Sequence, residues 1–446
     1  MINKHIKKII LSYMIIFILL GSFPILNAME LNIVQKNNDV NNNISIGLTN
    51  TLYVGNDDPN SFDSIQEAII AADSGDTIQV FDDSSPYYES IVIDKPLTII
   101  GENSSSTIID GGNKATTVHI SSAHVNFSGF TIKKSGTGSH DAGLKINSDD
   151  IIIYDVILFD NHMGISLEYA HDVSVSKSKI YQQDTIGIYC HESTNIILSE
   201  NMIRDNLVGI HLDKNARFNT VFANSLVSND DQGILLQQAS HNDIYWNIIS
   251  DSHRAIELRD ASSNDIYDEN LLTENTVGLF LQSSFDNKIY DNNMITYNEI
   301  GIYLFQSDNN DIHENQINHN SFGIVINDSS NVDFYWNEIQ KNIHGIEVIN
   351  SFSNEIYLNN ILDNYQNGLF IEMSSFTKVF YNNFIGNYIH SSFTIPFFSL
   401  NSWKENYWDD WEKTGFYEIT GEFETMFPLN FLKKYDFSPS NEPYDI

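Results

Sequence analysis

Five side chains with acid–base or metal-binding chemistry recur at equivalent positions of three successive sequence repeats. They are Glu168, Tyr189, His191, His211 and Asp213, each two or four residues after a repeated glycine. Imidazole and carboxylate groups bind copper and zinc, and they also act as general acids and bases. Stacked strands about 4.8 Å apart would bring the five groups within roughly 10 Å. The spacing predicts a metal site at Glu168, His191, His211 and Asp213 or an acid–base site, with solvated polar residues as the simpler alternative.

A row of aromatic side chains offers a second kind of chemistry. Three residues after successive asparagines the chain carries Phe222, Tyr245, Tyr267, Tyr290, His313, Phe334, Tyr357 and Phe380. Outward rings of this kind suit stacking on sugar rings, but stacked aromatics also stabilise a sheet by themselves.

Outward positions after later repeat glycines carry a second aromatic group, Phe280, Tyr303, Phe305 and Phe370. If exposed, these rings form a binding surface; if covered, they are core. Farther back on the same face, a Glu–Arg pair at Glu257 is most simply a surface salt bridge. From the two groups we predict glycan contacts at Tyr245, Tyr267, Tyr290, His313, Tyr357, Tyr303 and Phe305.

The elements that must position these residues follow from a repeat of 21 to 24 residues. Apolar residues stand one and three places after each of these positions: Gly143, Gly164, Gly187, Gly209, Gly233, Ala255, Gly278, Gly301, Gly323, Gly345 and Gly368. The apolar stretches alternate as strands do and are too short for helices. One coil cannot bury its apolar side alone, so coils must stack. The repeat predicts an all-β, right-handed parallel β-helix with coils of about 22–23 residues.

Three rows of asparagine mark the corners of the expected coils. The first is Asn195, Asn219, Asn242, Asn264, Asn287, Asn310, Asn331 and Asn354. The second is Asn201, Asn224, Asn247, Asn270, Asn293, Asn315, Asn337, Asn360 and Asn383, and the third includes Asn206, Asn229, Asn275, Asn298, Asn320, Asn342, Asn364 and Asn387. Because asparagine tolerates left-handed backbone conformations and bonds its own turn, the rows predict three strands per coil.

Both ends of the repeat region carry features of a cap. Residues 64–67, Ser-Ile-Gln-Glu, form a capping-box motif that begins a short helix, and Gly75 ends it. This N-terminal capping helix should cover the open edge of the first coil. The expected organisation is a signal peptide or membrane anchor at 1–28, a polar linker at 29–50, an N-terminal cap with the first coils at 51–142, regular coils at 143–400 and an aromatic C-terminal cap at 401–446.

The N-terminus and the composition limit the location and the partners. Lys4, Lys7 and Lys8 precede an apolar run, which is typical of a secretory signal, with an uncleaved membrane anchor as the alternative. The chain has 23 Lys+Arg and 59 Asp+Glu, a net charge of −36. Such a charge repels nucleic-acid phosphates, anionic lipid surfaces and polyanionic substrates. We expect an exported protein, extracellular, at the cell surface or periplasmic, without a nucleic-acid partner.

Over roughly residues 51–430 the chain resembles the NosD-type periplasmic copper-binding proteins and the wider carbohydrate-binding and sugar-hydrolase (CASH) β-helix repeat family. Besides the glycine–asparagine coils, the resemblance rests on residues 64–68 (Ser-Ile-Gln-Glu-Ala), 75–78 (Gly-Asp-Thr-Ile), 109–112 (Ile-Asp-Gly-Gly), 406–410 (Asn-Tyr-Trp-Asp-Asp) and 427–429 (Phe-Pro-Leu). It implies an exported right-handed β-helix that handles a sugar polymer, the assembly of a copper centre or surface contacts. It transfers no catalytic motif to numbered residues.

Three functions remain open at the level of the sequence. The leading one is a non-catalytic exported β-helix that binds a polysaccharide or surface glycan, or that contacts surface-layer or membrane proteins. The alternative is NosD-like copper handling, and calcium is the other metal that Asp and Asn oxygens suit. The third is a polysaccharide lyase or glycoside hydrolase, which needs a base and usually acidic pairs. Polygalacturonase-like Gly-His-Gly and Arg-Ile-Lys motifs do not occur in the sequence.

Overall fold

The computed structural model describes residues 50–55, 59–395, 400–423 and 432–446, and residues 49–446 form one compact unit. The signal or anchor expected at 1–28 and the linker expected at 29–50, apart from its last residue, lie outside the described residues. Within the described ranges, no helix has the length and apolar character needed to cross a membrane.

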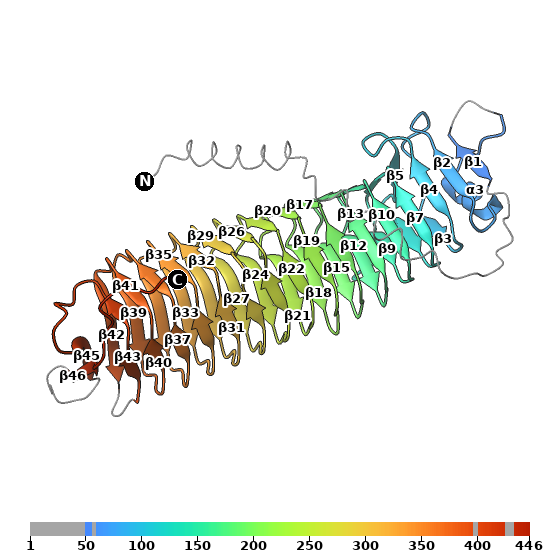
Figure 1. The fold of residues 1–446 in the computed structure, drawn as a ribbon. Coiled ribbons are helices and arrows are strands. Elements are labelled where there is room, and N and C mark those ends of the chain that lie inside the picture. Colours follow the sequence, from blue (N-terminus) through green and yellow to red (C-terminus); the bar gives the residue numbers. More distant parts are fainter. Residues whose placement is uncertain (1–49, 56–58, 396–399, 424–431) are drawn as a thin grey trace, which may run out of the picture. The chain divides into compact units, whose positions relative to one another are not determined.

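The described chain is a stack of coils, each with up to three short strands that pair with equivalent strands of the next coil (Figure 1). Strands on the first face, most of which contain the repeat glycine, are β3 (Ile91–Ile93), β6 (Val118–Ile120), β9 (Ala142–Ile146), β12 (Met163–Glu168), β15 (Ile186–His191), β18 (Val208–Asp213), β21 (Gln232–Gln237), β24 (Arg254–Arg259), β27 (Val277–Gln282), β30 (Ile300–Phe305), β33 (Phe322–Asn327), β36 (His344–Ile349), β39 (Asn367–Glu372), β42 (Ile389–Ile395) and β45 (Tyr417–Phe423).

The second face is formed by β1 (Thr51–Val54), β2 (Thr77–Val80), β4 (Thr98–Gly101), β7 (Val125–Ser128), β10 (Ile151–Tyr154), β13 (Val173–Ser176), β16 (Ile197–Ser199), β19 (Thr220–Phe222), β22 (Asp243–Tyr245), β25 (Asp265–Tyr267), β28 (Lys288–Ile289), β31 (Asp311–His313), β34 (Asp333–Tyr335), β37 (Glu355–Tyr357), β40 (Lys378–Phe380), β43 (Ser402–Lys404) and β46 (Leu432–Asp436).

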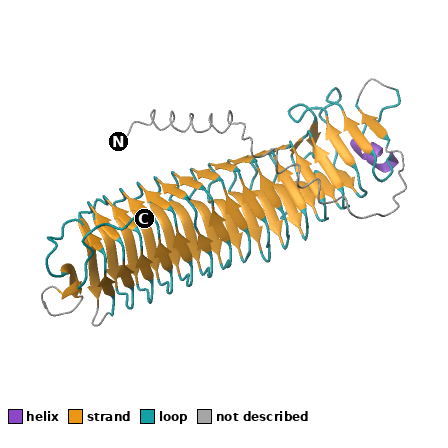
Figure 2. Cartoon of the chain, in the orientation of Figure 1, coloured by secondary structure: helices purple, strands orange, loops and turns teal. Residues whose placement is uncertain are grey.

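The third face is formed by β5 (Ile108–Asp110), β8 (Thr131–Lys133), β11 (Ile157–Phe159), β14 (Lys179–Tyr181), β17 (Met202–Arg204), β20 (Ser225–Val227), β23 (Ile248–Ser250), β26 (Leu271–Thr273), β29 (Met294–Thr296), β32 (Gln316–Asn318), β35 (Glu338–Gln340), β38 (Asn360–Leu362), β41 (Asn383–Ile385) and β44 (Tyr407–Trp408). Short loops join the strands, and helix α3 (Ile65–Ala71) lies at the N-terminal end of the stack (Figure 2).

Parallel pairing keeps equivalent residues of successive coils in register. Ile165 pairs with Ile188, and Ile188 pairs with Ile210. All three side chains point inward and have no exposed surface. The inward Ile, Leu and Val side chains of all coils form one continuous core, whose burial drives the stacking. The all-β fold of parallel stacked coils predicted from the repeat is confirmed.

The repeat glycine is required by close packing between coils. A Cβ atom on Gly187 would lie 2.6 Å from the carbonyl oxygen of Gly209, a distance that no side chain tolerates. The strand register omits this position, since Met163 pairs with Ile186 and Ile165 with Ile188. The residues one place before the glycine and two and four places after it therefore point outward together.

Buried asparagines form one-directional hydrogen-bond ladders along the stack. The Asn247 side-chain amide donates to Asn270 Oδ1 at 3.1 Å, and the Asn247 backbone N–H donates to the same oxygen at 3.0 Å. The same side chain donates to the carbonyl oxygen of Val221, in the preceding coil, at 2.9 Å. Each asparagine thus satisfies backbone groups at the corners of neighbouring coils, which would otherwise be buried without partners.

The structure corrects four members of the expected rows, which are not part of the buried ladders: Asn195, Asn331, Asn360 and Asn383. The ladder positions belong to their neighbours in the sequence, Ile196, Val332, Asn359 and Asn382. The left-handed residue is also not the buried asparagine but the residue before it, such as Trp246 with φ 54°. The asparagine is retained for its side-chain hydrogen bonds and not for its backbone conformation.

Helix α3 packs against β1, β2 and β3 and covers the first coil, as the sequence predicts. Ser64 Oγ accepts the Glu67 N–H at 3.3 Å, which is half of the expected capping box. The remaining contacts come from Glu89, whose carboxylate accepts the Ile65 N–H at 2.9 Å and the Gln66 N–H at 3.0 Å. A residue distant in the sequence therefore completes the helix N-cap.

The last coil is closed by β45 and β46, which pair in antiparallel orientation. Asp436 is fully buried and accepts the Asn406 N–H at 2.9 Å, the Asn406 side-chain amide at 3.2 Å and the Trp408 Nε1–H at 3.2 Å. It stands where the next asparagine of the second row would be. A carboxylate has no N–H to donate onward, so the ladder ends here.

Candidate functional site

The outward side chains of the first face form two rows, which together we call the strip. The row two places after the repeat glycine is Ser166, Tyr189, His211, Leu235, Glu257, Phe280, Tyr303, Val325, Glu347 and Phe370. The row four places after it is Glu168, His191, Asp213, Gln237, Arg259, Gln282, Phe305, Asn327, Ile349 and Glu372. Titratable groups gather toward its N-terminal coils and aromatic groups toward its C-terminal coils.

Tyr189, His191 and Asp213 form a hydrogen-bonded network on β15 and β18. The Tyr189 hydroxyl donates to Asp213 Oδ2 at 2.7 Å, and His191 Nδ1 lies 3.1 Å from the same oxygen. An ionised carboxylate only accepts, so this contact assigns a proton of His191 to Nδ1, while Nε2 lies 3.8 Å from Glu192 Oε1. Burial, and then the bond to Asp213, raises the pKa of Tyr189, which keeps its hydroxyl a donor. The network is an oriented acid–base arrangement.

His211 lies beside this network without a hydrogen bond to it. Its Nε2 is 4.0 Å from Asp213 Oδ1, and among the described residues this nitrogen has no hydrogen-bond partner. The His211 side chain is 13% exposed. Burial outweighs the attraction of Asp213 and lowers the pKa of His211 to about 4. At neutral pH the ring is therefore uncharged, with Nε2 buried and without a hydrogen-bond partner among the described residues.

Glu168, the fourth residue of the expected metal set, is engaged by other partners. Lys145 Nζ lies 2.9 Å from its carboxylate, and Ser166 Oγ donates to it at 3.2 Å. Burial favours the protonated form, but these contacts prevail and lower the pKa of Glu168. The structure thus brings His191, His211 and Asp213 together and pairs Glu168 with a lysine.

The donor groups of this region do not fit a copper centre. In the described part of the chain, three donor atoms lie within 4.8 Å of one another at His390, Asp409 and Asp410, outside the expected set. Cys190 points inward and is fully buried, and burial raises its pKa to about 12, so the thiolate that copper prefers is not formed at neutral pH. Met202 lies on the third face, away from the histidines.

The group at His390 was not anticipated from the sequence. His390 Nε2 lies 2.8 Å from Asp409 Oδ1 and 3.3 Å from Asp410 Oδ1. Across the ring, the Asn387 side-chain amide lies 3.3 Å from Nδ1, while the Asn387 oxygen accepts from Asn364. These contacts assign Nδ1 as the acceptor and Nε2 as the N–H donor to the carboxylates. Because Nε2 carries the proton, its lone pair is not available to a metal in this arrangement. The His390 ring accepts from Asn387 and thereby ends the third asparagine row.

Glu257 forms a buried ionic network in the middle of the strip. Its side chain has no exposed surface, in contrast to the surface salt bridge expected from the sequence. The carboxylate accepts hydrogen bonds from Arg254 NH1 at 3.0 Å, from Arg259 Nε at 3.0 Å and from Gln232 Nε2 at 2.7 Å. Glu257 is buried because the outward side chains of the neighbouring coils cover it.

The C-terminal half of the strip places aromatic rings beside amide groups. Phe280 and Tyr303 lie 5.2 Å apart between ring centroids and are tilted by 31°, and Tyr303 and Phe305 lie 6.4 Å apart at 45°. Gln282 and Asn327 flank Phe305 in its row. Asn327 Nδ2 donates to the Tyr303 hydroxyl at 3.4 Å, and Asn327 Oδ1 has no partner in the described residues. The sequence-based prediction did not include the amides Gln282 and Asn327, although both stand four places after a repeat glycine.

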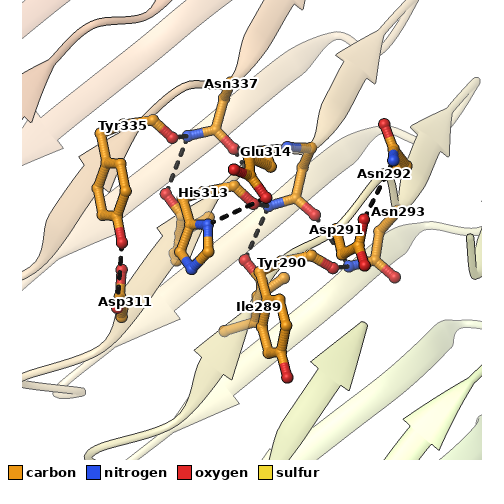
Figure 3. Close-up of polar contacts among 12 residues, drawn as sticks. Ile289, Tyr290, Asp291, Asn292, Asn293, Asp311, His313, Glu314, Tyr335 and Asn337 are labelled. Atoms are coloured by element: carbon orange, nitrogen blue, oxygen red, sulfur yellow. Dashed lines mark hydrogen bonds and ion pairs between the residues drawn. The ribbon is translucent and has the colours of Figure 1, made fainter. Parts of the chain in front are cut away.

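The aromatic row of the second face has a different geometry. Tyr290, His313 and Tyr335 stand side by side with parallel rings (Figure 3). Adjacent centroids along the row are 4.7–5.3 Å apart and adjacent planes differ by 6–27°, in the order Phe222, Tyr245, Tyr267, Tyr290, His313, Tyr335, Tyr357 and Phe380. We call these eight rings the ladder.

Tyr335 takes the ladder position that the sequence assigned to Phe334, which is a fully buried core residue. Because each inner ring of the ladder is covered on both faces by its neighbours, no inner face is free to stack on a sugar. Trp246 and Trp336 stand nearly perpendicular to the ladder rings Tyr245 and Tyr335, at 78° and 68°. They are 47% and 48% exposed.

Two family models match the sequence. The model described as periplasmic copper-binding protein (NosD) matches residues 72–264, and the model described as right handed beta helix region matches residues 224–361. A comparison with curated proteins gave no match.

Solved structures with a similar fold share little sequence. A DFA-IIIase from Arthrobacter chlorophenolicus A6, in complex with GF2, is 12% identical over 70% of this chain and 94% of that chain, with a TM-score of 0.50. The A-module of a mannuronan C-5 epimerase from Azotobacter vinelandii is 13% identical over 77% and 93%, with a TM-score of 0.40. An alginate lyase from a Paenibacillus species is 12% identical over 61% and 95%, with a TM-score of 0.37. These similarities concern the fold. With the stacked parallel coils, the two family matches support a NosD-type right-handed β-helix family for residues 72–361.

Proposed function

We propose that this protein is an exported β-helix that binds a glycan along the strip. The observation that carries the proposal is the pair of half-buried, tilted rings at Tyr303 and Phe305 beside the amides of Gln282 and Asn327. A sugar ring has apolar faces and polar edges, so a chain lying across both rows stacks on the rings and bonds the amides.

The extent of the strip favours a polymer over a small molecule. Its rows run through ten successive coils, from β12 to β39, which corresponds to about 43 Å at the usual spacing between strands. The polar network at Tyr189 and the aromatic patch at Tyr303 lie in the same rows, within reach of one extended ligand. Export, which residues 1–28 and the periplasmic family description favour, would place the protein where polysaccharides occur.

The test compares two sets of substitutions on a panel of immobilised polysaccharides. Tyr303→Ala with Gln282→Ala removes one ring and one amide of the strip, whereas Tyr245→Ala, Tyr267→Ala and Tyr290→Ala remove three rings of the ladder. We expect the native protein and the ladder variant to be retained alike, and the strip variant to lose at least about tenfold in affinity. Retention that depends on the ladder and not on the strip, or no retention of the native protein, would overturn the proposal.

A second candidate function rests on the His191–Asp213 contact. An imidazole held by a carboxylate at Nδ1 is an arrangement used for general-base catalysis, and here Nε2 lies 3.8 Å from Glu192 Oε1, beyond hydrogen-bond distance. The protein would then act on the glycan that it binds. Product formation from the same polysaccharide panel tests this function, and His191→Ala should abolish it while the glycan is still retained. If the native protein forms no product from a polysaccharide that it retains, the catalytic function is rejected.

A further inference from the structure

Glu257 is a charged side chain without exposed surface at an outward position of the strip. The neighbouring coils have Leu235 and Phe280 at the same position, so the packing does not call for a carboxylate. Removing a carboxylate from water is costly and is compensated only by close partners. Glu257 has these partners in Arg254 and Arg259, and its geometric effect is to hold two guanidinium groups in fixed positions.

Arg259 keeps hydrogen-bond donors for a ligand. Its Nε and NH2 groups donate to Glu257 Oε1 at 3.0 and 2.6 Å, and its NH1 group has no hydrogen-bond partner among the described residues. The side chain is 35% exposed. Gln237 and Gln282 are its neighbours in the row, one coil before it and one coil after it. The result is a fixed cation between two amides.

Arg254 makes different contacts and does not offer the same site. Its guanidinium lies 5.1 Å from the centroid of the Phe280 ring and 3.6 Å from Asp231 Oδ1. Asp231 is 45% exposed and compensates part of this charge. Glu257 is the only carboxylate within 4 Å of Arg259 in the described ranges, and it is shared with Arg254. The formal charges of the network cancel, but among the described residues Arg259 faces only the carboxylate that it shares with Arg254.

We propose that Arg259, held by Glu257 and flanked by Gln237 and Gln282, is a subsite for an oxyanion substituent on an otherwise uncharged glycan. The inference rests on the proposed binding of a glycan along the strip and names its chemical class. A guanidinium group matches the geometry of carboxylate and sulfate groups. The net charge of −36, with Asp213, Glu347 and Glu372 in the strip, repels a polymer that is charged at every unit. The ligand class is a sparsely acidic glycan.

The experiment uses the full-length protein and four forms of one retained glucan. They are the uncharged polymer, the polymer carboxylated at low density, the polymer sulfated at the same low density and the polymer carboxylated at every unit. We expect one or both of the low-density polymers to bind at least about tenfold more tightly than the uncharged and the fully carboxylated forms. The two low-density arms tell which oxyanion the subsite accepts.

Substitutions assign the preference to Arg259. Arg259→Gln should remove the preference, so that the uncharged and the low-density polymers bind this variant with equal affinity. Arg217→Gln, which removes the same charge at an exposed corner, should keep the preference. Because Arg259→Gln leaves Glu257 with fewer partners, Arg254→Met with Glu257→Leu and Arg259→Met replaces the whole network by apolar groups and should also lose the preference.

Two results would overturn the inference and leave the proposed function standing. The first is equal binding of the uncharged and low-density polymers by the native protein. The second is a preference that persists in both the Arg259→Gln protein and the triple variant. If the native protein binds none of the polymers, the proposed function fails together with the inference.

Discussion

Two tyrosines that lie two coils apart show how the surroundings decide what a side chain can do. Tyr267 stands between Tyr245 and Tyr290 with nearly parallel rings, so both of its faces are covered. Tyr303 is tilted against Phe280 and accepts a hydrogen bond from Asn327. The sequence placed both among the glycan contacts because residue type and spacing do not reveal ring orientation. We therefore assign stability to the ladder and binding to the strip.

The first prediction concerns the ladder. Tyr267→Ala should lower the free energy of unfolding by about 2 kcal/mol, because two stacking contacts and the buried ring area are lost. Tyr365→Ala is the matched control, since Tyr365 is 64% exposed. Denaturant unfolding of the three proteins measures the difference. Equal stability of the two variants would contradict the structural role of the ladder.

The second prediction concerns His211 and pH. Its pKa is about 4 in the folded protein, against 6.5 as the ordinary value. As pH falls from 6.5 to 4, the unfolded chain takes up a proton that the folded chain does not, so stability decreases, by about 3 kcal/mol in total. In the His211→Gln variant this part of the acid destabilisation should be absent. Unfolding free energies of both proteins at the two ends of this range test it, and parallel pH curves would refute the assignment.

The fold could be predicted from the sequence because the glycine and asparagine rows report the coil period directly. The assignment of single residues to rows was wrong where two adjacent residues in the sequence are of the same chemical type. Asn359 and Asn360 are both asparagines, and only burial shows that Asn359 belongs to the ladder of amides. Phe334 and Tyr335 are both aromatic, and the inward or outward direction separates them. The buried state of Glu257 depends on outward side chains of adjacent coils, which no local pattern contains.

The third prediction concerns the asparagine rows. In Asn270→Ala the backbone N–H and the side-chain amide of Asn247 lose their shared acceptor, and the carbonyl of Ile244 loses a donor. Buried polar groups without partners are destabilising, so we expect a loss of about 2–4 kcal/mol. Asn126→Ala, at an exposed strand position, should cost far less. A similar loss in the two variants would mean that the hydrogen bonds of the asparagine rows do not stabilise the coils.

At the scale of the whole solenoid, a stack of parallel coils has two open ends that must be blocked. Helix α3 covers the first coil, and the antiparallel pair β45 and β46 closes the last one. The net charge of −36 further opposes association of two copies. Unpaired strand edges otherwise pair with other chains, so the caps keep the repeat from continuing into a second molecule.

The fourth prediction concerns the C-terminal cap. Asp436→Ala removes the acceptor of Asn406 and Trp408 and should loosen β46 from the last coil. The exposed edge should then cause concentration-dependent association, which light scattering after size exclusion detects. The salt dependence serves as a control, because screening of the negative charge should increase the association. A variant that remains monomeric at all concentrations would show that Asp436 is not needed to block the edge.

The central claim is that the ligand lies on the strip, and hydroxyl-radical footprinting with and without the retained polysaccharide tests it most directly. Labelling of Tyr303 and Phe305 should fall when the polysaccharide is bound. Labelling of Trp246 and Trp336, which are exposed beside the ladder on the second face, should stay unchanged. Protection of the two tryptophans with unchanged labelling of Tyr303 and Phe305 would contradict the account and move the binding surface to the second face.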